Sequence, residues 1–308
     1  MELAREAAEV HRKVRALANK IAKPGIKLID LCERIEAENR KLVGARGLER
    51  GIAFPTGCSI NHIAAHFSPN PGDRSVLGPN DVLKIDFGTQ IGGIIIDCAW
   101  TIAPEKFAPL LDVVKEATNT GIKSAGVDAR LGEIGEAIGE VLIGEIEIDG
   151  KIQKIHPVRN LSGHDIKPYV IHGGKSIFAY KNDDQTKMYE GEFYAVETFG
   201  TTGRGIVSED YECSHYMKQP NVFAPIRMDS AKRLLHHVNK NYGTLAFCKR
   251  FLERDGVKYS GLKQLCDVGI VKAYPPLCDI RGSYVAQFEH TIFIKSSGVE
   301  VLSRGDDF

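Results

Sequence analysis

Four acidic residues stand in the middle of runs that otherwise have the composition of β-strands: Asp86, Asp97, Glu197 and Glu289. Acidic side chains are depleted in strands. Gathered on one surface without counter-charge, four carboxylates would repel one another and be driven toward protonation. Two divalent cations would offset their charge, so the pattern indicates a metal site. For any single one of them, a solvated position on an exposed sheet face is the simpler interpretation.

His164, directly after Gly163, offers a nitrogen ligand to the same site. Imidazole nitrogen suits transition metals, whereas calcium and magnesium prefer oxygen. A lone histidine after a glycine is more often a loop residue of intermediate exposure. His164 is therefore a candidate ligand only in combination with the carboxylates.

The segment 82–102 predicts a hairpin that brings Asp86 and Asp97 together. Its residues alternate with period two on either side of Gly92-Gly93, the pattern of two strands joined by a tight turn. With a two-residue turn, Asp97 lies opposite Gly88. The two carboxylates are then diagonal neighbours on one face, roughly 7 to 8 Å apart at Cα. A three-residue loop without a bulge would place them on opposite faces.

The remaining elements predict a mixed α and β fold. Apolar residues at helical spacing, bounded by breakers, predict helices over 2–22, 28–43, 110–125 and 131–146. Turn-forming residues from Phe54 to Pro79 predict loops and short strands, and strand-like patterns return over 150–216 and 284–294. Residues 229–270 predict a helical insertion of three short helices, interrupted at Gly243 and around Gly256.

Composition and charge exclude several classes of protein. Forty basic residues balance forty acidic ones among 308, so no global positive field would collect nucleic acid or anionic lipid. No apolar run is long enough for a membrane span, and the N-terminus lacks the pattern of a signal peptide. The seven cysteines are widely spaced and form no close pair. We expect a soluble cytoplasmic protein with no membrane or nucleic-acid partner.

A series of motifs follows one another in a fixed order: Phe54-Pro55-Thr56-Gly57-Cys58-Ser59, Ala64-Ala65-His66, Lys84-Ile85-Asp86-Phe87-Gly88, Ile95-Ile96-Asp97, Gly163-His164, Ala195-Val196-Glu197-Thr198-Phe199, Glu212-Cys213-Ser214-His215-Tyr216 and Gln287-Phe288-Glu289-His290-Thr291. Together they resemble the type 2 methionine aminopeptidases. The resemblance runs from about residue 5 to the C-terminal Phe308. The helical insertion after His215 is the feature that separates this type from type 1.

The resemblance implies the pita-bread fold. This is an α/β (α+β) catalytic domain, here over residues 1–308, in which helices flank a central antiparallel sheet with a pseudo-twofold; a helical insertion would occupy about 217–275. The resemblance also implies a dinuclear centre. Asp97 and Glu289 would bridge two divalent ions, Asp86 would bind one, and His164 with Glu197 would complete the other. Cobalt, manganese, iron(II) and zinc all suit such a ligand set.

The implied activity is removal of the initiator methionine from nascent chains whose second residue is small. A hydroxide shared by the two metals would attack the peptide bond, and Glu197 would carry the proton. His66 and His172 would touch the scissile amide and stabilise the tetrahedral intermediate, and His66 would react with fumagillin-type epoxides. The methionine side chain would occupy a narrow apolar pocket lined by Phe54, Ile171, His215, Ala246 and Tyr274.

The resemblance also bears on partners. Eukaryotic members often carry a long charged N-terminal extension, whereas this sequence begins almost directly with the catalytic region. Either the natural protein is compact or this sequence leaves such an extension out, so ribosome or initiation-factor contacts made through an extension stay open, as does association with the ribosome. A monomer is expected.

Two alternatives would use the same scaffold. Proline-specific pita-bread peptidases have the same five ligand types, but they usually carry an additional N-terminal domain and lack this insertion. A non-catalytic member would bind RNA or the ribosome after losing metal ligands, whereas all five are present here. Six basic residues of the insertion could form a nucleic-acid face, although such charges usually belong to a solvated helix surface: Lys232, Arg233, Lys240, Lys249, Arg250 and Arg254.

Overall fold

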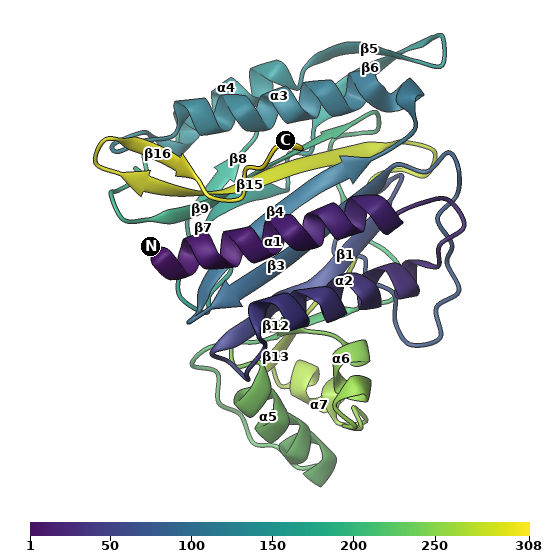
Figure 1. The fold of residues 1–308 in the computed structure, drawn as a ribbon, viewed down its shortest axis with the longest axis vertical. Helices are drawn as coiled ribbons and strands as arrows, with labels where there is room; N and C mark the ends of the chain where they lie inside the picture. Colours follow the sequence, from purple (N-terminus) through teal and green to yellow (C-terminus); the bar gives the residue numbers. More distant parts are fainter.

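Two pairs of helices cover one face of the strands that carry the acidic residues in the computed structural model, which describes all residues from 1 to 308 (Figure 1). Helices α1 (Glu2–Ile21) and α2 (Leu28–Val43) lie over one half, and α3 (Ala108–Ser124) and α4 (Leu131–Val141) over the other. The main hydrophobic core lies between these helices and the strands. Each half thus repeats a helix pair on antiparallel strands, which confirms the predicted α/β pita-bread arrangement.

The first half is built around the predicted hairpin. Strands β3 (Leu83–Ile91) and β4 (Ile94–Ile102) pair antiparallel, with Gly88 opposite Asp97 as the two-residue turn requires. Gly92 and Gly93 adopt φ of 61° and 82°, the positive values that such a turn needs at both positions. Alternation then buries the odd-numbered residues of β3 beneath α1 and directs Asp86 to the opposite face.

The second half is a larger, antiparallel sheet. Strand β15 (Val285–Lys295) pairs with β9 (Phe193–Thr201), and β9 also pairs with β7 (Ser162–Ile166) and β6 (Lys151–Pro157). Strands at its edges are β16 (Gly298–Val301), β5 (Gly144–Ile148) and β8 (Ser176–Phe178). The smaller elements are β2 (Ile63–Ala65), the 3-10 helix η1 (Glu105–Phe107), β10 (Ser208–Glu209) and β14 (Leu277–Cys278).

Two local predictions were wrong. The helix expected over 131–146 ends at Val141, because residues 144–148 form β5, which pairs with β6 across an Asp149-Gly150 turn. Both turn residues have positive φ, the hairpin signal that helical spacing obscured. The turn-rich stretch from Phe54 lies partly inside a long strand, β1 (Arg50–Ile60). Its proline and glycine fall where the pairing of β1 with β3 shifts register.

The segment expected as an insertion forms a separate lobe at the end of the molecule (Figure 1). It contains α5 (Asp229–Asn241), α6 (Lys249–Arg254) and α7 (Leu262–Asp267) around a core of its own. It is not wholly helical, since β11 (His215–Lys218) pairs with β12 (Ala246–Phe247) and β13 (Val271–Tyr274). Gly243 and Gly256 interrupt the helices with φ of 58° and 69°.

The lobe is tied to the first half by a buried ion pair. Arg250 of α6 donates two hydrogen bonds to the carboxylate of Glu36 on α2, at 2.6 and 2.8 Å, and both side chains are almost fully buried. The guanidinium also donates to Pro69 and Ser68.

None of the helices combines the length and apolar character that crossing a bilayer requires. All seven cysteines are free.

Candidate dinuclear metal site

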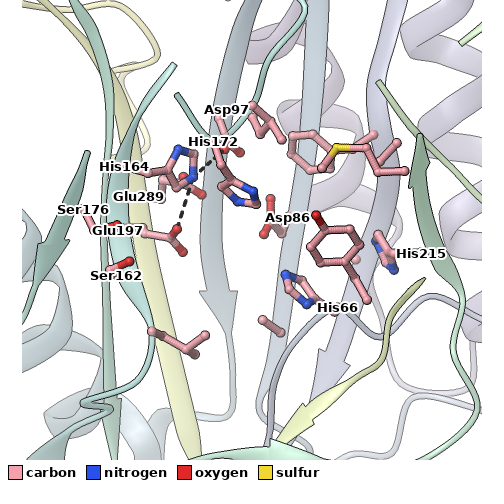
Figure 2. Close-up of a pocket in the computed structure, with 18 of the residues that line it drawn as sticks. His66, Asp86, Asp97, Ser162, His164, His172, Ser176, Glu197, His215 and Glu289 are labelled. Carbon is pink, nitrogen blue, oxygen red and sulfur yellow. Dashed lines mark ion pairs between the residues drawn. The ribbon is translucent and has the colours of Figure 1, made fainter. Parts of the chain in front are cut away.

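The structure brings all five candidate ligands to one place, on the face of the strands opposite the helices (Figure 2). Glu197 on β9 and Glu289 on β15 are paired directly across the ladder. His164 on β7 pairs with Ala195, two residues from Glu197 on the same face of β9. Asp86 and Asp97 arrive from the other half, on the β3–β4 hairpin. Like charges directly opposite one another destabilise a sheet, so this arrangement requires a compensating positive charge.

The ligand atoms lie within reach of a common cation. One atom each of Asp97, His164 and Glu289 fall within 4.8 Å of one another. The Nε2 atom of His164 lies 3.5 Å from Oε1 of Glu197 and 3.7 Å from Oδ2 of Asp97. Asp86 completes the group from the far side, where Figure 2 shows its carboxylate facing the same space.

Buried oxygens at this site have no hydrogen-bond partner within the chain. They are Oδ1 of Asp86, Oδ1 of Asp97 and both carboxylate oxygens of Glu289. Burial raises the pKa of Asp86 to about 7. Burial, reinforced by the neighbouring carboxylates, raises the pKa of Asp97, Glu197 and Glu289 well above its usual range. Bound cations would both pair with these oxygens and offset the repulsion between the carboxylates.

His164 is held in the state that a ligand needs. Burial lowers the pKa of its imidazole to about 3, so the ring is neutral. Its Nδ1 lies 3.4 Å from the carbonyl oxygen of Asp165, which can only accept a hydrogen bond, so Nδ1 carries the proton. The Nε2 lone pair is left to face the carboxylates. Orientation of a metal-binding imidazole through its other nitrogen is a common feature of metal sites, and the five residues fit divalent cations.

A cavity of about 340 Å³ opens beside the carboxylates. It is lined by every one of the predicted catalytic and substrate-binding residues, His66, His172, Glu197, Phe54, Ile171, His215, Ala246 and Tyr274. The ring of His172 packs edge-on against that of His164, with centroids 4.5 Å apart. The ring centroid of His66 lies 5.8 Å from that of His215 and 6.0 Å from that of Tyr274.

The imidazoles of this cavity are neutral. Burial lowers the pKa of His66 to about 3 and that of His215 to about 4, and it also lowers the pKa of His172. Nε2 of His215 lies 3.2 Å from the carbonyl oxygen of Pro55, to which it donates. A neutral imidazole offers one N–H donor, which suits His66 and His172 to polarising a carbonyl oxygen.

Phe54 is positioned by a close approach to the hairpin. A Cβ atom on Gly88, the residue opposite Asp97, would lie 2.4 Å from the Phe54 ring. Only glycine allows the ring to cross the strand there, so Gly88 sets the distance between the apolar wall and the carboxylates.

The loop that carries Ile171 and His172 is anchored at both sides. The backbone N–H of Tyr169 donates to the carbonyl of Gly93 in the hairpin turn, at 2.9 Å. The hydroxyl of Thr244, in the lobe that contains α5 to α7, donates to the carbonyl of Tyr169, at 2.6 Å. Tyr169 itself has a φ of 60°, which a non-glycine residue adopts only when its surroundings hold it.

Further residues of the site did not emerge from the sequence. The cavity is also lined by Ala65, Asn160, Leu161, Ser162, Lys175, Ser176, Phe199 and Met217. Gln287 lies behind it and contacts two of the carboxylates. Its position two residues before Glu289 on a strand is the signal that could have found it, because alternate strand residues share a face.

The fold and this site define a metallopeptidase. The model of the metallopeptidase family M24 matches residues 2–296, and the chain belongs to this family. The chain is 57% identical to methionine aminopeptidase 2 of Dictyostelium discoideum over 308 residues, which cover 99% of this chain and 70% of that protein. The resemblance inferred from the motifs is thereby confirmed.

Solved structures agree on the fold. A thermophilic Arx1 superimposes with a TM-score of 0.82 at 20% identity, covering 100% of this chain and 91% of that one. A methionine aminopeptidase from Thermotoga maritima superimposes with a TM-score of 0.67 at 19% identity, covering 99% and 96%. At this level of identity the likeness concerns architecture alone.

Proposed function

We propose that this protein is a metal-dependent methionine aminopeptidase that removes the initiator methionine from nascent chains. The observation that carries the proposal is the convergence of four carboxylates and one neutral imidazole on the lining of one partly apolar cavity. The assignment of methionine as the residue removed is supported by membership of a metallopeptidase family and by 57% identity to a methionine aminopeptidase 2.

The five ligands divide between two ions in this proposal. Asp86, Asp97, His164, Glu197 and Glu289 would together hold the two ions. When bound, two divalent ions polarise water and the scissile carbonyl, so that a nucleophile is available near neutral pH.

The side chains of the protein carry out the remaining steps. The carboxylate of Glu197, which faces the cavity, accepts a proton from water and returns it to the departing amine. His66 and His172, neutral and on the cavity wall, donate N–H to the carbonyl oxygen as it gains charge. The same exposure to the cavity makes His66 the expected site of alkylation by a fumagillin-type epoxide.

Selectivity for methionine follows from the wall opposite the ligands. This wall is formed by residues that line the same cavity as the carboxylates, namely Phe54, Ile171, His215, Ala246 and Tyr274. An unbranched thioether fills it, whereas each change of a methylene alters binding by about 1 to 3 kcal/mol.

The deciding experiment compares three peptides with chelator-treated protein to which manganese or cobalt is restored. Metal-dependent release of methionine from Met-Ala-Ser is expected, with none from N-acetyl-Met-Ala-Ser. Cleavage confined to bonds that precede proline, tested with Met-Pro-Ala-Ser, would assign the chain to proline-specific peptidases. No cleavage with any metal would favour the alternative of a non-catalytic scaffold that binds RNA or the ribosome.

Glu197→Ala tests the assigned roles directly. The substitution removes a ligand and the proton carrier together, so turnover of Met-Ala-Ser is expected to vanish at saturating metal. Retained turnover would refute the mechanism. Glu190→Ala, an exposed residue before the same strand, serves as the matched control.

The nucleic-acid scaffold is the weaker alternative, because its six basic residues do not form one free face. Arg250 is buried against Glu36. Lys249, Arg254 and Lys232 are paired with Glu212, Asp255 and Asp229. Arg233 and Lys240 alone have no acidic partner within 4.0 Å. A face of two charges is small for binding a polyanion.

The monomeric state, the cytoplasmic location and association with the ribosome stay predictions of the family resemblance. Analytical ultracentrifugation, fractionation of cells and co-sedimentation with purified ribosomes, respectively, would test them.

A further inference from the structure

Gln287 is a buried polar residue that the proposed mechanism does not use. It lies on β15 two residues before Glu289, with its side chain on the same face, and is 1% exposed. Its backbone is held by two hydrogen bonds to Thr101 on β4. Its N–H donates to Oγ1 of Thr101, and that hydroxyl donates to the Gln287 carbonyl, each at 2.8 Å.

The side-chain amide reaches two carboxylates from different halves of the fold. Nε2 lies 3.2 Å from Oε2 of Glu197 and 3.4 Å from Oδ2 of Asp86. The first distance is at the upper end of the usual N–H···O range and the second is beyond it, as expected when one amino group is shared between two acceptors. Glu197 stands on β9 and Asp86 on β3, so the amide spans the seam between the two sheets.

The orientation of the amide follows from its neighbours. Carboxylates that hold divalent ions are ionised and only accept hydrogen bonds, so in the metal-bound site the amino group and not the carbonyl must face them. The Oε1 atom consequently points away, and it is buried with no partner in the chain. Leaving a buried acceptor unpaired destabilises the folded chain, and the unpaired Oε1 is the consequence of turning both N–H bonds toward the ligands.

We propose that Gln287 is a positioning residue that holds Asp86 and Glu197 at a fixed separation for the two metal ions. The inference rests on the proposed function of the site. A ligand in a sheet is placed by its own strand, but these two strands belong to different sheets. The shared amide links their carboxylates directly, so that the geometry for each ion does not depend on independent movement of the two halves.

The chemistry of the amide suits this role. A lysine at the same position would also donate to both carboxylates, but its charge would compete with the metal. A glutamate would add a fifth negative charge without a donor. Glutamine supplies two donors and no charge, and therefore orients the ligands without lowering their attraction for a cation.

The test is a metal titration of chelator-stripped protein. We expect Gln287→Met, which keeps the length and removes the donors, to raise the Kd for Mn²⁺ measured by calorimetry about tenfold or more, as loss of partners behind metal ligands does. The visible absorption spectrum of the Co²⁺-loaded variant should differ from that of the wild type. Since Gln287 does not line the cavity, KM for Met-Ala-Ser at saturating metal should stay within about twofold while kcat falls.

Gln90→Met is the matched control. Gln90 is equally buried on β3, donates to Leu48 and accepts from Gly93, and touches no carboxylate. It is expected to lower the melting temperature without altering the Kd for Mn²⁺. If Gln287→Met does not fold, Gln287→Asn replaces it, since the shortened amide keeps the polarity but withdraws the donors.

The outcomes are separable. Wild-type protein that binds no Mn²⁺ would overturn the proposed function itself. Wild-type binding with an unchanged Kd and Co²⁺ spectrum in the Gln287 variant would overturn only the positioning role. Equal loss of affinity in the Gln287 and Gln90 variants would also overturn it, because the effect would then come from general packing.

Discussion

The hydroxyl of Thr291 on β15 exchanges two hydrogen bonds with the backbone of Asp97 on β4. It accepts from the Asp97 N–H and donates to the Asp97 carbonyl, each at 2.7 Å. In the same way, the hydroxyl of Thr101 on β4 accepts from the Gln287 N–H on β15 and donates to the Gln287 carbonyl. No backbone ladder joins β4 to β15, although the strands lie side by side. Two threonine hydroxyls therefore join the sheets at the candidate metal site.

Thr291→Val should weaken both folding and metal binding. Valine keeps the shape but leaves the buried N–H and carbonyl of Asp97 unpaired, at a cost of about 1 to 3 kcal/mol. Denaturant unfolding of the apo protein measures the first effect, and calorimetric titration with Mn²⁺ the second. Thr89→Val is the control, because Thr89 is equally buried but bonds Asn39. An equal change in metal affinity in both variants would contradict a special role for the seam.

Thr244→Val should affect catalysis without affecting metal affinity. The hydroxyl of Thr244 holds the carbonyl of Tyr169, and His172 lies three residues further along that loop. We expect kcat for Met-Ala-Ser to fall several-fold with an unchanged Kd for Mn²⁺. Thr244→Ser keeps the hydroxyl and should restore kcat. If serine and valine behave alike, the hydrogen bond does not position the loop.

Glu36→Ala should destabilise the fold strongly. It leaves the guanidinium of Arg250 buried and unpaired, and breaking a buried pair in this way costs about 3 to 5 kcal/mol. Glu212→Ala removes the partner of Lys249, which precedes Arg250 on α6. Because Glu212 is exposed, the expected loss of unfolding free energy is about 1 kcal/mol or less. Chemical unfolding of both variants compares the two pairs, and similar losses would contradict the assignment of the lobe's anchor to Arg250.

Protonation of His11 should reduce stability in acid. Burial, aided by Arg15, lowers the pKa of His11 to about 3, and Nε2 lies 2.9 Å from the Phe87 carbonyl, to which it donates. The unfolded chain binds a proton near pH 6.5 and the folded chain does not, so the contribution is complete above pH 6.5 and is lost as pH falls toward 3. Each pH unit below 6.5 removes about 1.36 kcal/mol of unfolding free energy, so the loss at pH 4.5 is about 2.7 kcal/mol.

The measurement is the unfolding free energy of wild type and His11→Gln at pH 7 and pH 4.5, in the presence of chelator. Glutamine can still donate to Phe87 but does not titrate, so the fall in stability between the two pH values should be smaller in the variant. An identical fall in both proteins would show that His11 titrates alike in the folded and unfolded chains.

Local patterns were sufficient for much of the architecture. Helical spacing located α1, α2 and α3, and alternation around Gly92-Gly93 predicted the register that makes Asp86 and Asp97 diagonal neighbours. Such features depend on contacts within a few residues. The same reasoning failed at Val141, where Asp149-Gly150 gives a hairpin that helical spacing did not reveal.

The sequence by itself determined which residues could bind metal, because acidic side chains in strand interiors and an ordered set of motifs are visible without coordinates. The tertiary structure decided that Glu197 faces Glu289, that His164 joins them and that Gln287 spans two sheets. The two contacts of Gln287 join residues that are 90 and 201 positions apart in the chain. Pairing at such separations depends on how whole sheets pack, and no local pattern records it.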